Sequence, residues 1–249
     1  MRISFIKAIY KVHFPLKKTV FYIILLCCPL LSFAQKEKVK NNPAYDDKPL
    51  HFGFSFGLNT MDFSMGRNYL SKPNDTLFAD VSNMVPGFQV NIVSDARLGE
   101  YFNLRFMPGI VFGQRDISFY GPNNIKWQVT KLESSFIDFP LSIKYKAKRL
   151  NNYRPYLISG FNVRYDLAAR NKFKENSQDY VMLKALDYYY EIGFGIDYYL
   201  LYFKFSTELK FSLGMRDIFN PIQEPNHPEY ARSIDHLTSQ MVLLSFHFE

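Results

Sequence analysis

The feature that most constrains this chain is a two-residue alternation between large apolar and small or polar side chains. Over residues 51–59, one set of alternate positions is apolar and consists of Phe52, Phe54, Phe56 and Leu58. The positions between them carry His51, Gly53, Ser55, Gly57 and Asn59. Because side chains alternate across a strand but not around a helix, this segment is expected to form a β-strand with one apolar face.

The same alternation recurs in seven more segments along the rest of the chain. They cover residues 87–93, 102–112, 137–146, 157–164, 190–198, 203–213 and 241–248. Each of the eight segments approaches the roughly 10 residues that a tilted strand needs to cross a bilayer. The small, Gly-rich polar face is typical of the crowded interior of a narrow barrel, whereas the polar face of a soluble sandwich would carry more charge.

The gaps between these segments alternate in length. Long gaps at residues 60–86, 114–136, 165–189 and 214–240 are separated by shorter ones at residues 95–101, 147–156 and 199–202. Bacterial outer-membrane barrels have short periplasmic turns and longer outer loops, and a soluble β-sandwich has no reason to alternate in this way. The sequence therefore predicts an all-β fold, an eight-stranded antiparallel up-and-down transmembrane β-barrel over residues 50–249. It would lie in the cell outer membrane with both termini periplasmic.

The inward face of the predicted barrel carries charges of both signs. We expect the lumen to contain Arg105, Asp138, Lys144, Lys146, Arg164, Glu191, Asp197, Lys204, Glu208 and Lys210. Buried charges are tolerated when they are paired, and a barrel of eight strands has little interior space. The pattern favours a filled polar lumen held by salt bridges. A polar binding site is the alternative, and a pore for solutes fits the residues less well.

Tyrosines gather where aromatic girdles belong in a membrane barrel. The short gaps are flanked by Tyr101, Tyr145, Tyr198, Tyr199 and Tyr202, and a long gap by Tyr165, Tyr188, Tyr189 and Tyr190. A Tyr ring suits a boundary that is apolar on one side and wet on the other. We expect a girdle at each end, although Tyr is also an ordinary strand former.

The N-terminal segment has the three parts of a secretory signal peptide. Basic residues precede an apolar run from Val20 to Leu31, which is followed by Ser32-Phe33-Ala34. We predict a signal peptide over residues 1–34 and a periplasmic N-terminal linker without defined structure over residues 35–49. An uncleaved anchor is the alternative, but the run falls short of the roughly 20 residues of a spanning helix.

Cleavage would change the composition of the chain. Cys27 and Cys28 both lie in the signal segment, so the mature chain would have neither a disulfide nor a thiol site. A lipoprotein signal is disfavoured because Leu26 precedes Cys27, where a small residue is required. Five of the 30 Lys and Arg residues would also be lost, leaving 25 against 23 Asp and Glu, a net charge of +2. The basic pI is thus no argument for a nucleic-acid partner.

The sequence offers three candidates for chemistry, none with a complete motif. Ser245 and His247 share a face and could act as nucleophile and base, but no orienting acid can be assigned, so structural roles are favoured. His51 faces inward, where a hydrogen-bonded interior residue is favoured over a proton-transfer group. The last long gap holds potential metal ligands in no recognised spacing, namely His227, Glu229, Asp235 and His236. We therefore predict no catalytic residue, no metal site and no cofactor.

Two parts of the chain resemble known families of small barrels. The run from His51 to Phe63 resembles the opening strand of the PorT/SprT proteins of the Bacteroidetes, through His51, Gly53, Gly57, Asn59, Met61, Asp62 and Phe63. The segments Phe139–Tyr145 and Arg154–Tyr156 resemble strands of the wider small-barrel family of that phylum. The likeness extends over residues 50–249, but only the opening strand points to PorT/SprT.

The resemblance implies a non-enzymatic outer-membrane component required for type IX protein secretion, and for gliding motility in species that glide. Its partners would be outer-membrane lipid and other type IX secretion components. The family offers no defined catalytic residues to carry over. Two other functions stay open on the sequence, a lipid-modifying outer-membrane enzyme and a structural or adhesive small barrel.

Overall fold

The computed structural model describes residues 39–67, 78–121, 126–169, 181–220 and 234–249. The chain divides into two units, residues 1–39 and 40–249, and every strand named below belongs to the second unit. The predicted signal peptide lies outside the described residues. Within the described ranges, no helix is both long enough and apolar enough to cross a membrane.

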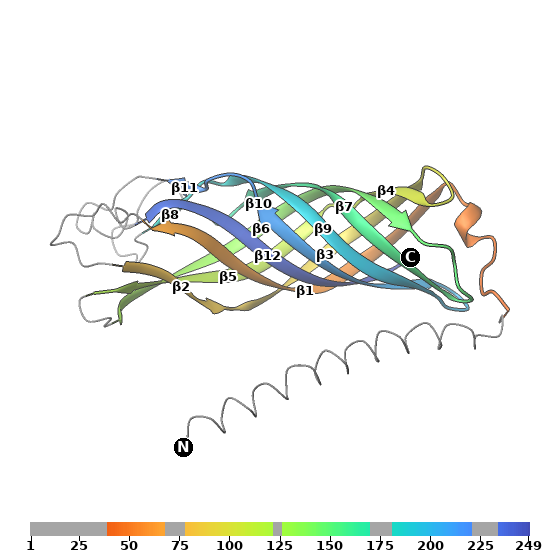
Figure 1. Ribbon diagram of the computed structural model, residues 1–249, viewed down its shortest axis with the longest axis horizontal. Coiled ribbons are helices and arrows are strands. Elements are labelled where there is room, and N and C mark those ends of the chain that lie inside the picture. Colours follow the sequence, from red (N-terminus) through yellow and green to blue (C-terminus); the bar gives the residue numbers. More distant parts are fainter. Residues whose placement is uncertain (1–38, 68–77, 122–125, 170–180, 221–233) are drawn as a thin grey trace, which may run out of the picture. The chain divides into compact units, whose positions relative to one another are not determined.

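The described residues form twelve strands, ten of which build one antiparallel sheet that closes into a ring (Figure 1). In chain order they are β1 (Leu50–Arg67), β2 (Phe78–Met84), β3 (Pro86–Arg97), β4 (Phe102–Phe106), β5 (Gly109–Tyr120), β6 (Lys126–Lys146), β7 (Tyr153–Asp166), β8 (Met182–Leu183), β9 (Leu186–Tyr199), β10 (Lys204–Gly214), β11 (Phe219–Asn220) and β12 (Ile234–Phe248). β8 and β11 pair separately with each other.

The ten strands make eight crossings of the ring. β2 and β3 together form one crossing, and β4 and β5 together form another. β2 and β3 pair in succession with β5, and β4 and β5 form one crossing that is interrupted at Met107 and Pro108. Pro108 has no backbone N–H to donate to a ladder, so regular pairing breaks there. β1 pairs with β12 on one side and β3 on the other, which closes the barrel. The prediction of an all-β, eight-stranded antiparallel up-and-down barrel is confirmed.

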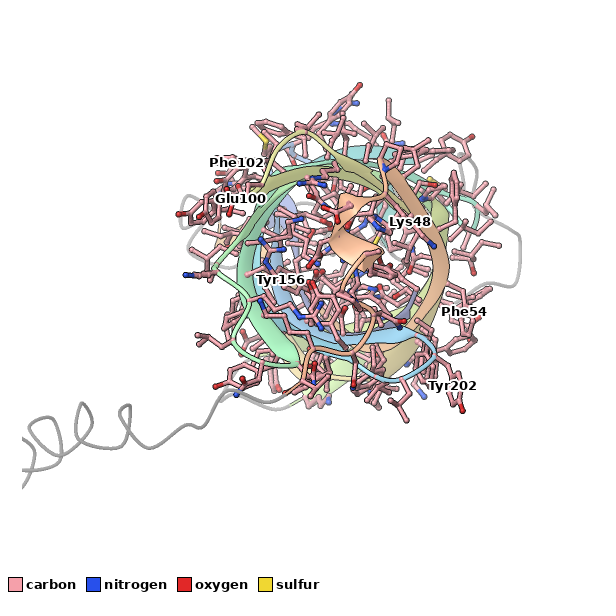
Figure 2. The ribbon with its side chains drawn as sticks, turned by 90° about the vertical axis from the view of Figure 1, so that its right-hand side faces the viewer. Lys48, Phe54, Glu100, Phe102, Tyr156 and Tyr202 are labelled. Carbon is pink, nitrogen blue, oxygen red and sulfur yellow. The ribbon has the colours of Figure 1, made fainter. Side chains whose placement is uncertain are left out.

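The outward faces of the ring form an apolar belt. On β1, alternate side chains from Leu50 to Leu58 are 49–66% exposed. Exposed apolar side chains also lie on β3 to β7, β9, β10 and β12. Figure 2 shows Phe54 and Phe102 outside the ring, while Tyr156 lies inside it. A continuous apolar surface of this extent suits a lipid environment rather than water.

Tyrosines border the belt, but three girdle assignments were wrong. Outward tyrosines at the short-turn end are Tyr101, Tyr145, Tyr198 and Tyr202, and those toward the other end are Tyr165 and Tyr188. Tyr189 and Tyr199 are one position out of phase with these, so they face the interior and are buried. Tyr190 points outward within the belt itself, opposite Phe161 of β7.

The strands are longer than predicted at the end opposite the short turns. β1 ends at Arg67 rather than residue 59, β6 begins at Lys126 rather than residue 137, and β12 begins at Ile234 rather than residue 241. The polarity of the two faces reverses in these extensions: Met61 and Phe63 point inward and are buried, between polar residues that point outward. Parts of the predicted gaps at residues 60–86, 114–136 and 214–240 are therefore strand. The sequence pattern missed them because the polarity of the two faces reverses there.

The extension involves one side of the ring. β12, β1, β2, β5 and β6 continue beyond the last pairs made by β7 and β10, which are Asp166 with Phe136 and Leu213 with Gln240. Their inner faces and the β8–β11 region form an apolar group, the outer cluster, of Phe63, Ala79, Ile117, Phe119, Val181, Leu183, Ile218, Phe219, Ile234 and Leu237. The outer cluster closes the lumen at the end that carries the long loops.

An arginine in the apolar belt should destabilise the barrel, and an arginine on the outer extension should not. Ile92→Arg places a charge among the lipid-facing residues of β3, at an expected cost of about 2–4 kcal/mol. Ser64 is exposed among polar residues of the extension, so Ser64→Arg should change stability by no more than about 0.5 kcal/mol. Denaturant titration in lipid vesicles measures both free energies of unfolding. Equal losses would contradict this boundary of the belt.

Candidate functional site: a sealed charged lumen

The structure places all ten charged residues predicted for the lumen inside the barrel, and none of them is more than 4% exposed. It adds six that the sequence prediction missed, namely Asp95, Arg115, Arg154, Asp166, Asp187 and Glu249. Each missed residue lies in phase with inward positions, just beyond the end of a predicted run. Continuing the alternation by one to three further residues would have found them.

Arg105 is the centre of a group of buried charges near the short-turn end. It donates from Nε and Nη2 to one carboxylate oxygen of Asp95, at 2.9 and 2.6 Å, and from Nη2 to Glu249 at 2.8 Å. Its Nη1 lies 3.6 Å from Glu208. Three carboxylates from β3, β10 and the C-terminal residue thus converge on one guanidinium, which holds together parts of the chain far apart in sequence.

Two lysines complete this group, the Arg105 cluster. Lys144 donates to both carboxylate oxygens of Asp197 at 2.8 Å and lies 3.7 Å from the centroid of the Tyr156 ring. Lys204 donates to Glu249 at 2.7 Å. The Tyr156 hydroxyl in turn donates to Glu208 at 2.9 Å. Lys146, also predicted for the lumen, lies outside this cluster at the end of β6.

A second group, the Arg164 cluster, fills the middle of the lumen. Arg164 bonds Asp138 and Glu191 at 2.9 Å each, and Ser212 at 3.0 Å. Asn162 donates to the same two carboxylates, at 3.2 and 2.8 Å. The two clusters are joined through Lys210, which lies 3.2 Å from Glu191 and 3.4 Å from Glu208.

Arg115 forms the boundary between the charged lumen and the outer cluster. Its guanidinium lies over the rings of Phe63 at 4.3 Å and Phe136 at 5.3 Å. It donates to Ser239 at 2.7 Å and to Ser134 at 2.6 Å. A guanidinium can stack on aromatic rings while its edge donates hydrogen bonds, so it suits a position between polar and apolar layers.

Little free volume remains between these side chains. A cavity bordered by Ser55, Asp138, Lys210 and Ser245 measures about 10 Å³, which is room for about one water molecule. Removing one partner of a buried ion pair is costly because it leaves an uncompensated charge. The described part of the lumen is therefore a filled, mutually dependent network, and the fold class with a filled polar lumen is confirmed.

The residues before β1 close the mouth at the short-turn end, which corrects the expectation of an unstructured linker. A short 3-10 helix, η2 (Tyr45–Asp47), places the Asp46 carboxylate 2.7 Å from the Tyr199 hydroxyl, which donates to it. Asp46 also lies 3.3 Å from Arg154 and 3.8 Å from Arg149. These partners lie more than 100 residues away in the sequence, so the local sequence around Asp46 gave no sign of them.

Tyr45 and His51 form the inner surface of this cap. Their rings stack with centroids 4.3 Å apart, and Nε2 of His51 donates to the Tyr45 carbonyl at 2.8 Å. The Tyr45 hydroxyl reaches Glu249 at 3.4 Å, and burial raises the pKa of that hydroxyl. His51 therefore fastens the cap to β1.

The candidate nucleophile and base do not form a catalytic pair. The Ser245 hydroxyl accepts a hydrogen bond from Gln89 at 2.7 Å. Nε2 of His247 lies 3.5 Å from Glu208, the acid that could not be assigned from sequence. Ser245 and His247 are both buried in the filled lumen, where a lipid substrate has no described path to them.

The candidate metal ligands do not come together in the described residues. His227 and Glu229 lie outside those residues. Asp235 and His236 are adjacent and exposed, with 3.3 Å between Oδ2 and Nδ1. No group of three or more His, Cys, Asp or Glu side chains suited to a metal occurs in the described ranges.

The residues that resemble the PorT/SprT opening strand bring β1 close to its neighbours. A Cβ at Gly53 would lie 2.1 Å from the Phe248 carbonyl, and one at Gly57 would lie 2.6 Å from the Leu244 carbonyl. Asn59 donates to the Phe112 carbonyl at 3.2 Å, and Asp62 accepts from the backbone of the next residue at 2.8 Å. Met61 and Phe63 belong to the apolar packing above the lumen. This strand is thus adapted to barrel closure.

Residues 33–220 match the model of a protein family described as "Outer membrane protein beta-barrel domain". No curated protein sequence matches the chain. Among solved structures, OprG from Pseudomonas aeruginosa is 13% identical with a TM-score of 0.47, over 79% of this chain and 94% of OprG.

Two further solved structures are similar. AlkL is 11% identical with a TM-score of 0.39, over 87% of this chain and 95% of AlkL. Ail of Yersinia pestis is 8% identical with a TM-score of 0.35, over 79% of this chain and 96% of Ail. These low values carry no argument about function.

Removing Arg164 should strongly destabilise the barrel. Arg164→Ala leaves Asp138 and Glu191 buried without their main partner, at an expected cost of about 3–5 kcal/mol in the free energy of unfolding. Lys131→Ala is the matched control, because Lys131 is exposed on the outer extension, and it should change stability by no more than about 0.5 kcal/mol. Denaturant titration in vesicles measures both. If Arg164→Ala had the same free energy of unfolding as the wild-type protein, the network of buried ion pairs would be contradicted.

Removing the Asp46 carboxylate should loosen the cap but not the barrel. In Asp46→Ala, hydrogen–deuterium exchange of residues 41–47 should accelerate while exchange in the strands stays unchanged, because the contacts to Tyr199 and Arg154 are lost. Asp47→Ala is the control, since Asp47 is mostly exposed and pairs with Arg97 at the surface. Acceleration by both variants to the same extent would disprove the role assigned to Asp46.

Proposed function

The chain belongs to the family of outer membrane protein β-barrel domains, and from this premise we propose that it is a non-enzymatic component required for type IX protein secretion. In species that glide, the same component would be required for gliding motility. The role in type IX secretion is supported by the resemblance of residues 51–63 to the PorT/SprT opening strand. The location in the outer membrane agrees with the apolar belt of the fold.

The observation that carries the proposal is the filled lumen. The cavity bordered by Ser55, Asp138, Lys210 and Ser245 measures about 10 Å³, so the described part of the lumen around it has no room for a cargo chain or a solute. A barrel of this kind acts through its surfaces, which are the lipid-facing belt, the outer extension and the short-turn end. Attachment of other secretion components to these surfaces is the role that best fits the structure.

We infer that the short-turn end faces the periplasm, as in other bacterial barrels with short inner turns. On this orientation the η2 cap and the charged groups around it, Arg97, Arg149 and Arg154, face periplasmic partners. The outer extension and its loops face the cell exterior. Both termini of the barrel unit then lie on the periplasmic side.

An enzymatic role has less support. Ser245 is bonded to Gln89 rather than to a base, and both Ser245 and His247 are buried among paired charges. Lipid-modifying chemistry would need a nucleophile that a lipid can reach. On the lipid-facing belt, Ser159 is hydrogen-bonded to the Tyr190 hydroxyl at 2.8 Å rather than to an imidazole or a carboxylate.

A structural or adhesive role is the second candidate, and the outer extension favours it. The outer cluster gives five strands a packed core beyond the belt, which would hold the ends of these strands in fixed positions. An adhesive barrel would lose surface binding when loops are removed, whereas export of secreted cargo would continue. Measuring cargo export and surface binding in the same loop-deletion strain therefore distinguishes the two functions.

Deleting the gene should block export of type IX cargo. The secreted proteins of the deletion strain are compared with those of its parent by quantitative mass spectrometry, and cargo should disappear from the medium and accumulate inside the cell. Complementation with the wild-type gene and with Ser245→Ala should restore export equally, because Ser245 has no catalytic role. Normal export in the deletion strain would reject the proposal.

A further inference from the structure

The outer extension has an open sheet edge on β6. The last pair that β7 makes with β6 is Asp166 with Phe136, and β6 continues beyond that pair to Lys126. On its other side, β6 pairs with β5 from Lys126 to Asp138. Among the described residues, no strand pairs with the opposite side of residues 127–134. Such an edge presents backbone groups with which another chain can pair.

Ser135 shows which backbone groups of β6 point away from β5. Its N–H donates to the Asp166 carboxylate at 3.3 Å, and its carbonyl accepts from the N–H of Leu167 at 2.8 Å. Both groups of Ser135 therefore point to the side on which β7 ends. Along an antiparallel strand, the two backbone groups of a residue share a direction that alternates from one residue to the next.

By this alternation, Val129, Lys131 and Glu133 direct their backbone groups to the open edge. The pairing with β5 is regular from Ser135 to Gln128, so the alternation is not interrupted between them. The one hydrogen bond to these groups within the described ranges is long, at 3.5 Å from the Gln128 side chain to the Val129 carbonyl. Three donors and three acceptors are thus arranged in a row for a partner strand.

This edge lacks the usual features that prevent strand addition. Residues 128–134 contain no proline, and their pairing with β5 has no bulge. A charge that pointed inward would also exclude a further strand. The charged side chains of Lys131 and Glu133 are instead exposed on the outward face, so they leave the edge accessible and can select a partner by its charge.

The side chains beside the edge define the chemistry of a partner strand. On the outward face, Lys131 has no ion pair within the described ranges, because Asp116 opposite it on β5 accepts from Gln114 at 2.8 Å instead. On the inward face, Leu132 packs partly buried against the outer cluster, and the buried Thr130 hydroxyl has no described hydrogen-bond partner. Opposite charges and apolar pairs stabilise neighbouring strands.

We propose that the open edge of β6 binds an extended segment of another protein, which adds a strand to the outer extension. The segment carries an acidic residue beside Lys131, with apolar and hydroxyl side chains at the alternate positions that face inward. In this mode of recognition, backbone pairing supplies the affinity and the side chains supply the specificity. On the orientation inferred above, the partner lies outside the cell. The site is independent of the role in secretion.

Hydrogen exchange of the protein alone tests whether the edge is free. The full chain is folded in lipid nanodiscs, and amide exchange is followed by NMR. The amides of Val129, Lys131 and Glu133 should exchange at least about a hundredfold faster than those of Thr130 and Leu132, which point to β5. Native mass spectrometry gives the oligomeric state. Slow exchange at all five amides would overturn the proposal, since a segment of this chain in a monomer, or a second copy in a dimer, would already cover the edge.

A synthetic peptide tests binding at the edge. The peptide has valine at alternate positions, threonine between them and one central glutamate, and fluorescence anisotropy measures its affinity for the protein in nanodiscs. It should bind saturably and slow exchange at Val129, Lys131 and Glu133. Methylation of its backbone nitrogens should weaken binding at least about tenfold, because several hydrogen bonds are lost. Absence of saturable binding, or binding that leaves the three amides unprotected, would reject the site.

Reversal of one charge tests the preference for an acidic segment. A central lysine in the peptide should weaken binding about fivefold, and Lys131→Glu should reverse the preference between the two peptides. Lys148→Glu is the matched control, because Lys148 is exposed at the short-turn end, and this variant should keep the wild-type preference. Heat-modified gel migration verifies that both variants are folded. An unchanged preference in Lys131→Glu would overturn the proposal.

Discussion

The structure depends on the pairing of buried charges inside the barrel. Arg105 and Arg164 each bind carboxylates from more than one strand, and Lys210 joins the two clusters through Glu191 and Glu208. A charge left alone in this interior would cost several kcal/mol, so each residue requires the others. The same pairing fills the lumen and joins the two strands that flank β1, because Glu249 follows β12 and Asp95 lies on β3. Because the interior is filled, we assign the function of the barrel to its outer surfaces.

The second constraint is the environment outside the ring. Where lipid surrounds the barrel, apolar side chains point out and polar ones point in; where water surrounds the extension, the order is reversed. β1 passes through both regimes, with Phe54 pointing to lipid and Phe63 pointing into the outer cluster. Arg115 lies at the change between them, stacked on Phe63 and bonded to Ser134. The reversal of polarity along β1 thus marks the depth at which the membrane ends.

Much of this could be predicted from the sequence, because a strand has a fixed period of two. The alternation predicted the ring, the belt and the inward position of residues such as Lys144 and Glu191. It did not predict the extensions, since reversed polarity at Met61 and Phe63 resembles the end of a run. The η2 cap and the Arg105 cluster rest on contacts between residues far apart in sequence, such as Arg105 with Glu249.

The claim that the lumen is sealed by paired charges can be tested by electrical recording. The full chain is inserted into a planar lipid bilayer and the current is measured under an applied voltage in concentrated salt. A lumen filled as described predicts a trace equal to that of the protein-free bilayer. Stable stepwise currents from the wild-type protein would contradict a sealed lumen and with it the assignment of function to the outer surfaces.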